Sequence, residues 1–362
     1  MLSPRASAGG AACVGGTGWP RGVWEYRRHA SPPYTEQQAA AAKSNPQSQN
    51  IKTSAMCAHQ QSWRWEWRSQ DPECPFEQPN RSSLCHRLRG KRILLYGDSL
   101  TQQLYVSLAS LAGDAHTVGK PGECSRVKPV ECVRVCDGTS LLCQRLQFGL
   151  VLDTLGERRA PLGNCSVRPT GVGPLSEIFS PPCICSFDLI IIQEFAHWVG
   201  ANGAMFLEKC LRQQGDPDAG TVAQYHVLQL YGEQMRRNAA FLRNATSGQR
   251  TRVVFRTAIP GYPPKAILAP HTPDGKAPVF VAPSTDTSWA ARYSEYESSK
   301  WNHHMWAKIN EAAKSAYTAN GLSILDTEPP MLQRVDGHLD ELHYCLPGPP
   351  DFYSYAIFNY LL

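Results

Sequence analysis

The stretch "RILLYGDSLTQQ", residues 92–103, decides how the fold is interpreted. Its apolar first half is typical of a buried strand that ends at Gly97, and a polar stretch compatible with a helix follows. Ser99 stands at the junction of the two. A serine there can cap the helix, or it can be a nucleophile presented at the carboxyl end of the strand. The twelve residues alone leave both interpretations open.

Strand-like and helix-like segments alternate along the rest of the chain. Such alternation predicts an α/β fold in which helices cover both faces of a parallel sheet. Ligands bind at the carboxyl ends of the strands in such sheets, which is where Gly97, Asp98 and Ser99 lie. The expected strands are 91–97, 187–193, 250–258 and 322–327, and the expected helices are 99–113, 221–246, 300–321 and 350–362.

Composition limits the class of protein and of partner. The chain has 362 residues, 42% of them hydrophobic and 19% charged, with a formal net charge of +5. These values are typical of a globular protein. Because there is no long Lys/Arg run and no zinc-finger or RNA-binding signature, we expect no nucleic-acid partner. Residues 1–60 predict a low-complexity, linker-like extension, and residues 61–362 predict the folded domain.

The thirteen cysteines indicate the compartment. They do not form the paired C-x-x-C or Cys/His sets that zinc requires, so we expect disulfides and no metal site. Their odd number predicts that at least one thiol stays free or pairs with another chain. Sequons at Asn80, Asn164 and Asn244 agree with a secretory route.

The N-terminal residues do not resemble a signal peptide. No stretch of the chain is apolar over the 18 or so residues that a membrane span requires. Either the protein is cytosolic or this sequence lacks its natural start. The cysteines favour the second explanation, which leaves open whether a membrane anchor was lost.

A nucleophilic serine requires a base, and residues 336–353, "DGHLDELHYCLPGPPDFY", offer one. In serine hydrolases a histidine takes the hydroxyl proton and a carboxylate orients its ring. Asp340 and His343 are spaced i and i+3, so on a helical turn the carboxylate can reach the ring. Taken alone, the two residues are more often a surface pair.

Other candidate residues have ordinary explanations. His197 follows a buried strand directly and is interpreted as a core histidine or a pocket residue. His303 and His304 are interpreted as helical residues without a metal partner. Trp63 and Trp65 are more typical of packing than of a sugar platform.

Two blocks near the ends of the predicted domain resemble one protein family. Residues 64–103, "RWEWRSQDPECPFEQPNRSSLCHRLRGKRILLYGDSLTQQ", and residues 340–351, "DELHYCLPGPPD", are similar to the outer motifs of the trichome birefringence-like proteins. These plant proteins are part of the PC-esterase group of the SGNH/GDSL superfamily. "VVFRTAIP" (253–260) and "LDTEPPMLQRVDGH" (325–338) resemble two intermediate motifs. The resemblance covers residues 62–362, with Tyr344 in place of the usual Trp, and residues 23–35 resemble a remnant of the family's N-terminal region.

The resemblance implies a fold and a set of site residues. The fold would be a three-layer α/β/α, SGNH-hydrolase-like parallel sheet with a cysteine-rich insertion. Ser99 would be the nucleophile, His343 the base and Asp340 the residue that orients it. Asp98 would shape the turn after the strand, and Cys345 would anchor the catalytic loop through a disulfide. Four further residues match family positions that shape the site: Arg256, Arg334, Asp336 and His338.

One motif departs from the family. The family motif D-x-L-x-x-N-x-G-H-W supplies an Asn that helps stabilise the oxyanion, whereas residues 188–198 read "DLIIIQEFAHW", with neither that Asn nor the Gly. Gln193 could donate in its place, and His197 with Trp198 match the H-W pair. Losing one oxyanion donor costs ~10²–10³ in rate. The candidate oxyanion or pocket residues are Gly97, Asp98, Gln193, His197 and Arg256.

The resemblance also implies a reaction. It is the O-acetylation of polysaccharide hydroxyls in the Golgi lumen through an acetyl-serine. The expected partners are a polysaccharide acceptor and an acetyl donor, acetyl-CoA or another, and no tightly bound cofactor is expected. A polysaccharide acetyl-esterase would use the same residues. The altered motif around Gln193 would suit a catalytically weakened glycan-binding or wall-organising protein, and a cytosolic GDSL lipase would require free thiols.

Overall fold

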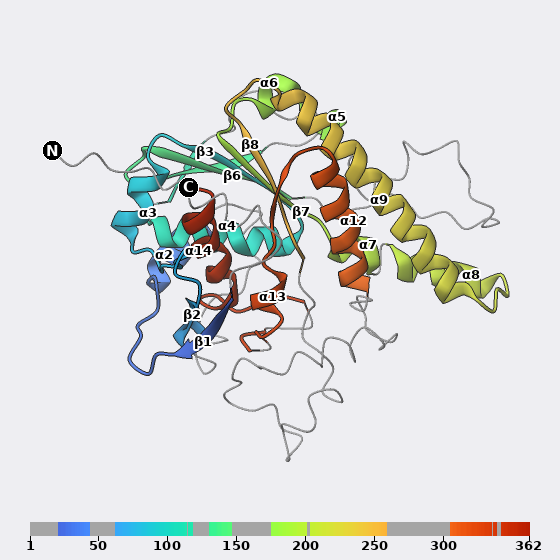
Figure 1. Ribbon diagram of the computed structural model, residues 1–362, viewed down its shortest axis with the longest axis horizontal. Helices are drawn as coiled ribbons and strands as arrows, with labels where there is room; N and C mark the ends of the chain where they lie inside the picture. The colour runs from blue at the N-terminus through green and yellow to red at the C-terminus, as the bar shows by residue number, and fades with distance from the viewer. Residues whose placement is uncertain are drawn as a thin grey trace, which may run out of the picture.

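The computed structural model describes residues 21–43, 62–113, 115–118, 130–146, 175–200, 203–258, 305–334, 336–338 and 342–362. Within them, seven strands form one sheet in the order β4-β5-β6-β3-β7-β8-β9, and two more form a separate ribbon, β1-β2. Helices lie on both faces of the large sheet (Figure 1). This arrangement confirms the predicted α/β/α fold.

The centre of the sheet is parallel and consists of strands that the sequence predicts. They are β3 (Arg92–Gly97), β7 (Leu189–Gln193), β8 (Arg252–Arg256) and β9 (Ser323–Leu325). β3 pairs with β7, β7 with β8 and β8 with β9. Every residue of β7 is buried because helices cover both faces, which explains its unbroken apolar run. The carboxyl ends of these strands lie at one edge of the sheet.

Two groups of helices cover the sheet (Figure 1). On one face, α4 (Ser99–Ala112) packs against α14 (Pro349–Tyr360), α2 (Glu36–Ala42) and α3 (Arg81–Leu88). On the other face, α9 (Ala219–Thr246) packs against α8 (Ala204–Gln213) and α12 (Trp306–Ala319). Every residue of α4 after Ser99 is buried, so the helix that follows the motif lies in the core.

Short elements connect these helices and strands. They are the 3-10 turn η3 (Ser62–Arg64) and the one-turn helices α5 (Leu175–Ile178), α6 (Pro181–Ile184), α7 (Ala196–Val199) and α13 (Glu328–Met331). The helix expected from residue 300 begins at Trp306. Residues 301–304, with His303 and His304, lie outside the described residues.

The cysteine-rich segment extends the main sheet. β6 (Ser140–Leu146) pairs in parallel with β3, while β5 (Glu131–Val135) pairs antiparallel with β6 and β4 (His116–Val118) with β5. The sequence predicts only short strands and loops here. Gln144 and Arg145 interrupt the apolar run of β6, so periodicity does not assign this strand to the centre of a sheet.

Disulfides brace this segment, as expected. Cys132–Cys143 joins β5 to β6, and Cys85–Cys136 ties α3 to the hairpin that connects the two strands. Cys345 is also disulfide-bonded, as the family resemblance implies. Among the described cysteines, Cys185 has a free thiol, in agreement with the odd number in the chain.

Residues 21–43 are part of the folded structure, so the expectation of a linker-like extension is wrong for them. β1 (Gly22–Tyr26) pairs antiparallel with β2 (Trp65–Ser69). Trp24 Nε1 donates to the carbonyl oxygen of Pro330 at 3.0 Å, and the Tyr34 hydroxyl donates to buried Asp351 at 3.0 Å. These contacts are long-range, which is why local composition does not reveal them. The boundary near residue 60 stays a prediction.

Membrane-spanning helices and metal-binding clusters are both absent from the described ranges. No helix there is long and apolar enough to cross a bilayer. The same ranges contain no cluster of three or more His, Cys, Asp or Glu side chains arranged to hold a metal ion. The predicted location and the predicted lack of a cofactor stay predictions.

Candidate active site

Asp98 caps α4, and Ser99 is the first residue of the helix. Asp98 Oδ1 accepts a hydrogen bond from the Leu100 N–H at 3.0 Å. The interpretation of Ser99 as a helix cap is therefore wrong, and its hydroxyl is left for other partners. Gly97 makes the tight turn possible, because a Cβ there would overlap the carbonyl oxygen of Gln193 and the Oγ1 of Thr101.

The second oxygen of Asp98 holds the neighbouring loop against this turn. Asp98 Oδ2 accepts hydrogen bonds from the N–H groups of Phe195 and Ala196, both at 3.2 Å, and from Gln193 Nε2 at 3.4 Å. The residue is 2% exposed, so the carboxylate relies on these donors in place of water. Asp98 thus joins the ends of β3 and β7, which agrees with the turn-shaping role that the resemblance implies.

Ser99 and His343 meet across the fold. His343 Nε2 lies 2.7 Å from Ser99 Oγ, although the two residues are 244 positions apart. Both side chains are half-buried at the carboxyl edge of the sheet. A hydroxyl within hydrogen-bond reach of an imidazole is the pair that activates a serine nucleophile. Asp340 lies outside the described residues, so its orienting role stays a prediction.

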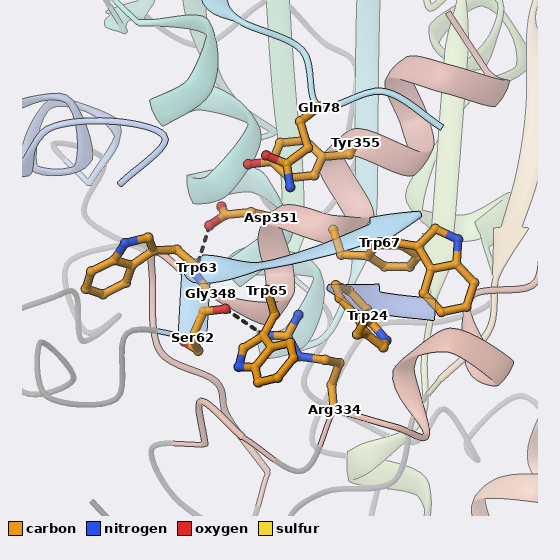
Figure 2. Close-up of a pocket in the computed structure, with 11 residues that line it drawn as sticks. Trp24, Ser62, Trp63, Trp65, Trp67, Gln78, Arg334, Gly348, Asp351 and Tyr355 are labelled. Atoms are coloured by element: carbon orange, nitrogen blue, oxygen red, sulfur yellow. Dashed lines mark hydrogen bonds between the residues drawn. The ribbon is translucent and has the colours of Figure 1, made fainter. Parts of the chain in front are cut away.

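Arg334 and Asp336 connect the segment before His343 to the N-terminal ribbon. Arg334 Nε and Nη2 donate to the two oxygens of Asp336 at 2.6 and 2.7 Å, and Nη2 also donates to the Ser62 carbonyl at 2.9 Å. Figure 2 shows Arg334 between Ser62 and Trp24, and its guanidinium lies 4.2 Å from the ring centroid of Trp24. Both charges are buried, so each depends on the other. His338, the last residue of this group, forms an isolated bridge with Tyr344.

A small pocket lies between the ribbon and α14 (Figure 2). Its lining includes Trp24, Trp63, Trp65, Trp67, Arg334 and Asp351. The ring centroid of Trp24 is 5.4 Å from that of Trp67 and 5.2 Å from that of Phe352. The ring centroids of Trp65 and Tyr26 lie 5.2 Å apart. The pair with Tyr26 agrees with the packing interpretation of Trp65, and the packing interpretation of Trp63 stays a prediction.

Gln193 has three side-chain partners. Its Oε1 accepts from Thr101 Oγ1 at 2.9 Å and from Arg256 Nη2 at 3.1 Å, while its Nε2 donates to Asp98. The side chain is fully buried. The geometry does not support the expected oxyanion-donor role, because the amide is directed into the core as a bridge between Asp98 and Arg256.

Arg256 is a buried cation beside this bridge. It is 1% exposed, and its guanidinium lies 4.2 Å from the ring centroid of Tyr353. Within the part of the chain that the structure describes, its Nε and Nη1 have no hydrogen-bond partner. Burial lowers the pKa of this guanidinium, and the charge of Asp98 partly opposes the shift. Arg256 therefore lies inside the core, where it is linked through Gln193 to Asp98 in the turn before Ser99.

Sequence reasoning did not single out Glu194. The side chain is 6% exposed, and burial raises its pKa to about 7. A hydrogen bond from Trp198 Nε1 at 3.4 Å opposes this rise, and the nearby charge of Asp98 adds to it. The signal in the sequence was a carboxylate placed directly after a buried strand, a position that removes it from water.

His197 lies near the proposed reacting pair. It is half-buried in α7, and burial lowers its pKa. The charge of Asp98 opposes this shift and that of His343 adds to it. His197 is therefore within electrostatic reach of Asp98 and His343, and its role as a pocket residue stays a prediction.

The fold and this geometry define a class, namely α/β/α proteins with a serine–histidine pair at the carboxyl edge of a parallel sheet. Residues 183–360 match the model of PC-Esterase, described as a GDSL/SGNH-like acyl-esterase family found in Pmr5 and Cas1p. The match covers slightly less than half of the chain and includes His343 but not Ser99, so these residues are similar to a PC-Esterase domain. No curated protein matches the chain. The family match supports acyl-ester chemistry in general and does not separate transfer from hydrolysis.

Proposed function

We propose that this protein is a polysaccharide O-acetyltransferase that works through an acetyl ester on Ser99. The observation that carries the proposal is the 2.7 Å contact between His343 Nε2 and Ser99 Oγ. The PC-Esterase match supports acyl chemistry, and the resemblance to the trichome birefringence-like proteins supports a polysaccharide acceptor. The disulfides favour a secretory compartment, for which we propose the Golgi lumen.

In the first half-reaction, Ser99 Oγ attacks the carbonyl carbon of an acetyl donor while His343 Nε2 takes the hydroxyl proton. The tetrahedral intermediate collapses, the bond to the leaving group breaks, and His343 returns the proton to that group. In the second half-reaction, a sugar hydroxyl gives its proton to His343 and attacks the acetyl ester. Ser99 then recovers the proton. In this proposal Asp340 orients the imidazole.

The helix end contributes to the chemistry. Ser99 stands at the N-terminus of a 14-residue helix, where the backbone dipole favours negative charge by ~0.3–1 kcal/mol. The Leu100 N–H is already bonded to Asp98, so it serves the turn and not an oxyanion. The developing charge on the substrate therefore depends on other donors at this edge of the sheet.

An acetyl-esterase is the second candidate, because the matching family is described as an acyl-esterase family. The same serine and histidine would perform both reactions. The reactions differ in the group that resolves the acetyl ester, which is a sugar hydroxyl in the transferase and water in the esterase. The experiment must therefore follow both fates of the acetyl group.

The full chain, secreted from a host with an oxidising compartment, would be incubated with p-nitrophenyl acetate or acetyl-CoA. Deacetylated xylans, mannans and pectins would serve as acceptors, and acetylated forms of the same glycans as esterase substrates. Mass spectrometry would follow acetyl on glycan and free acetate, with Ser99→Ala beside the wild type. We expect acetyl to appear on one class of glycan only when Ser99 is present.

Two other results would change the assignment. Release of acetate from acetylated glycans without transfer would establish the esterase. If neither product depends on Ser99, the acyl-transfer proposal fails and the glycan-binding alternative takes its place. Binding of a glycan without turnover would then support that alternative.

A further inference from the structure

Gln103 lies one helical turn after Ser99 on α4. Residues four apart on a helix project from the same face, so its side chain lies next to that of the serine. Gln103 is 2% exposed. A carboxamide carries two donor hydrogens and an acceptor oxygen, and burial requires that they find partners in the protein.

The partner of Gln103 is the backbone of the residue that follows His343. Gln103 Nε2 donates to the Tyr344 carbonyl oxygen, and Gln103 Oε1 accepts from the Tyr344 N–H at 3.1 Å. The side chain thus bonds to Tyr344 in both directions, as a neighbouring strand would. Two adjacent contacts therefore join the first turns of α4 to one extended segment: Ser99 to His343 and Gln103 to Tyr344.

The other side of this segment is bonded to residues 336–338. Tyr344 forms an isolated bridge with His338, and the Cys345 N–H donates to the Gly337 carbonyl at 2.6 Å. Cys345 is also disulfide-bonded. These contacts hold the segment in the protein, but they do not join it to the helix that carries Ser99. The two hydrogen bonds between Gln103 and Tyr344 join the segment to that helix.

We propose that Gln103 is a positioning residue that sets the Ser99–His343 distance by clamping the Tyr344 backbone to α4. The inference rests on the proposed roles of Ser99 and His343. Proton transfer requires the hydroxyl and the imidazole within hydrogen-bond reach. A displacement of 1 Å in such a pair can cost ~10²-fold in rate. The clamp matters here because the two groups come from segments 244 residues apart.

Asn310 provides a matched control, because it makes the same kind of clamp elsewhere. Its side chain accepts from the Ala258 N–H at 2.8 Å, and it donates to the Ala258 carbonyl at 2.7 Å and to Glu328. Asn310 is fully buried on α12. Gln103→Met and Asn310→Leu each replace a buried amide with an apolar group of similar size. Both variants are expected to lower the stability, and only Gln103→Met is expected to misplace His343.

The readout is the rate at which a fluorophosphonate labels Ser99. Ser99 Oγ forms a bond to phosphorus, fluoride leaves, and His343 takes the hydroxyl proton, so the reaction needs the pair but not the natural substrate. The full chain is used, and the rate is expressed per folded molecule from parallel unfolding curves. We expect Gln103→Met to label ~10²-fold more slowly than wild type, and Asn310→Leu to label within ~3-fold of it.

Gln103→Glu adds a pH-dependent test and covers the case in which Gln103→Met does not fold. An ionised carboxylate cannot donate to the Tyr344 carbonyl, but a protonated carboxyl has one donor and one acceptor and restores both bonds. The ratio of variant to wild-type labelling is therefore expected to rise as the pH falls from 8 to 5. Taking the ratio removes the loss that both proteins share when His343 becomes protonated.

The labelling experiments can contradict either the positioning role of Gln103 or the assignment of Ser99 as the nucleophile. Labelling of Gln103→Met at the wild-type rate, equal slowing by Asn310→Leu, or a Gln103→Glu ratio that does not change with pH would overturn the positioning role. If wild-type protein is not labelled above Ser99→Ala, the nucleophile itself is wrong, and the proposed function fails together with the clamp.

Discussion

Gln193 and Glu194 are neighbours in the chain, but their side chains lie in contrasting surroundings. Gln193 contacts Asp98, Thr101 and Arg256, so both ends of its amide are bonded. The Glu194 side chain accepts from Trp198 Nε1, and its backbone carbonyl accepts from the Tyr231 hydroxyl of α9. Gln193 is the last residue of β7 and Glu194 is the first residue after it, so the two side chains lie on either side of the point where the strand ends.

The difference shows that two buried polar groups behave differently according to whether hydrogen-bond partners or opposite charges surround them. The Gln193 amide is neutral and lies between a buried carboxylate and a buried guanidinium. Glu194 is a carboxylate among tyrosines, and no cation of the described residues forms an ion pair with it. Its pKa rises to about 7 because burial disfavours the charged form. Substitutions around Gln193 should therefore lower the free energy of unfolding most, whereas substitutions around Glu194 should mainly change how that free energy depends on pH.

The largest effect is expected from Asp98→Ala. The change removes the cap of α4, leaves the N–H groups of Phe195 and Ala196 without an acceptor, and takes a counter-charge from Arg256. We expect the free energy of unfolding to fall by ~3–5 kcal/mol, measured by denaturant titration. Glu233→Ala removes an exposed partner of Arg237 and should change it by ~0–1 kcal/mol. Similar small losses from both variants would contradict the pairing argument.

The next effect is expected from Gln193→Met, which removes the bridge but leaves both charges in place. Unsatisfied buried groups should lower the free energy of unfolding by ~1–3 kcal/mol. Because the amide is directed into the core, labelling of Ser99 per folded molecule should stay within ~10-fold of wild type. A loss of ~10²–10³ would restore the oxyanion role that the structure does not support.

Glu194→Gln is expected to change the pH dependence of stability. The folded-state pKa of about 7 lies above the ~4.3 of an unfolded glutamate, so the folded protein retains a proton that the unfolded chain releases. Stability should therefore fall as the pH rises from about 4.5 to 7. The variant should lose ~1–3 kcal/mol less over this window, measured by thermal or denaturant unfolding at several pH values. Parallel curves for variant and wild type would contradict the assignment to Glu194.

The smallest effect is expected from Trp198→Phe. The indole N–H donates to Glu194 and lowers its pKa, so removing it should raise the pKa of Glu194 further. The pH at which stability levels off should then move upward. A midpoint that stays in place or moves down would show that the tyrosines around Glu194, and not Trp198, control its charge.

Much of the fold could be predicted because the information is local. The strands at β3, β7, β8 and β9 are apolar runs, and the helices at α4, α9, α12 and α14 follow in the expected order. β6 was missed because Gln144 and Arg145 break its apolar pattern. The fold of residues 21–43 was missed because their partners, such as Pro330 and Asp351, are about 300 positions away.

The candidate site likewise contains residues that the sequence indicated and residues that it did not. Ser99 and His343 were found as motifs at opposite ends of the domain, and the structure places them 2.7 Å apart. The buried contacts of Gln193 do not support its expected oxyanion role, because a motif shows which residue stands at the end of a strand but not which groups surround its side chain. Gln103 and Glu194 were not singled out, because Gln and Glu are common and their partners lie elsewhere in the chain.

The sequence by itself determined the alternation of strands and helices and the position of the Gly97-Asp98-Ser99 turn. Its motifs also resemble those of a family that performs acyl chemistry. These depend on hydrophobic periodicity and on the few residue types that a tight turn or a nucleophile tolerates. Only the tertiary structure decided that Asp98 caps the helix, that Gln193 bridges two charges and that Gln103 holds the segment of His343. Hydrogen bonds and the free energies of buried charges depend on distances between segments, and those distances exist only after the chain has folded.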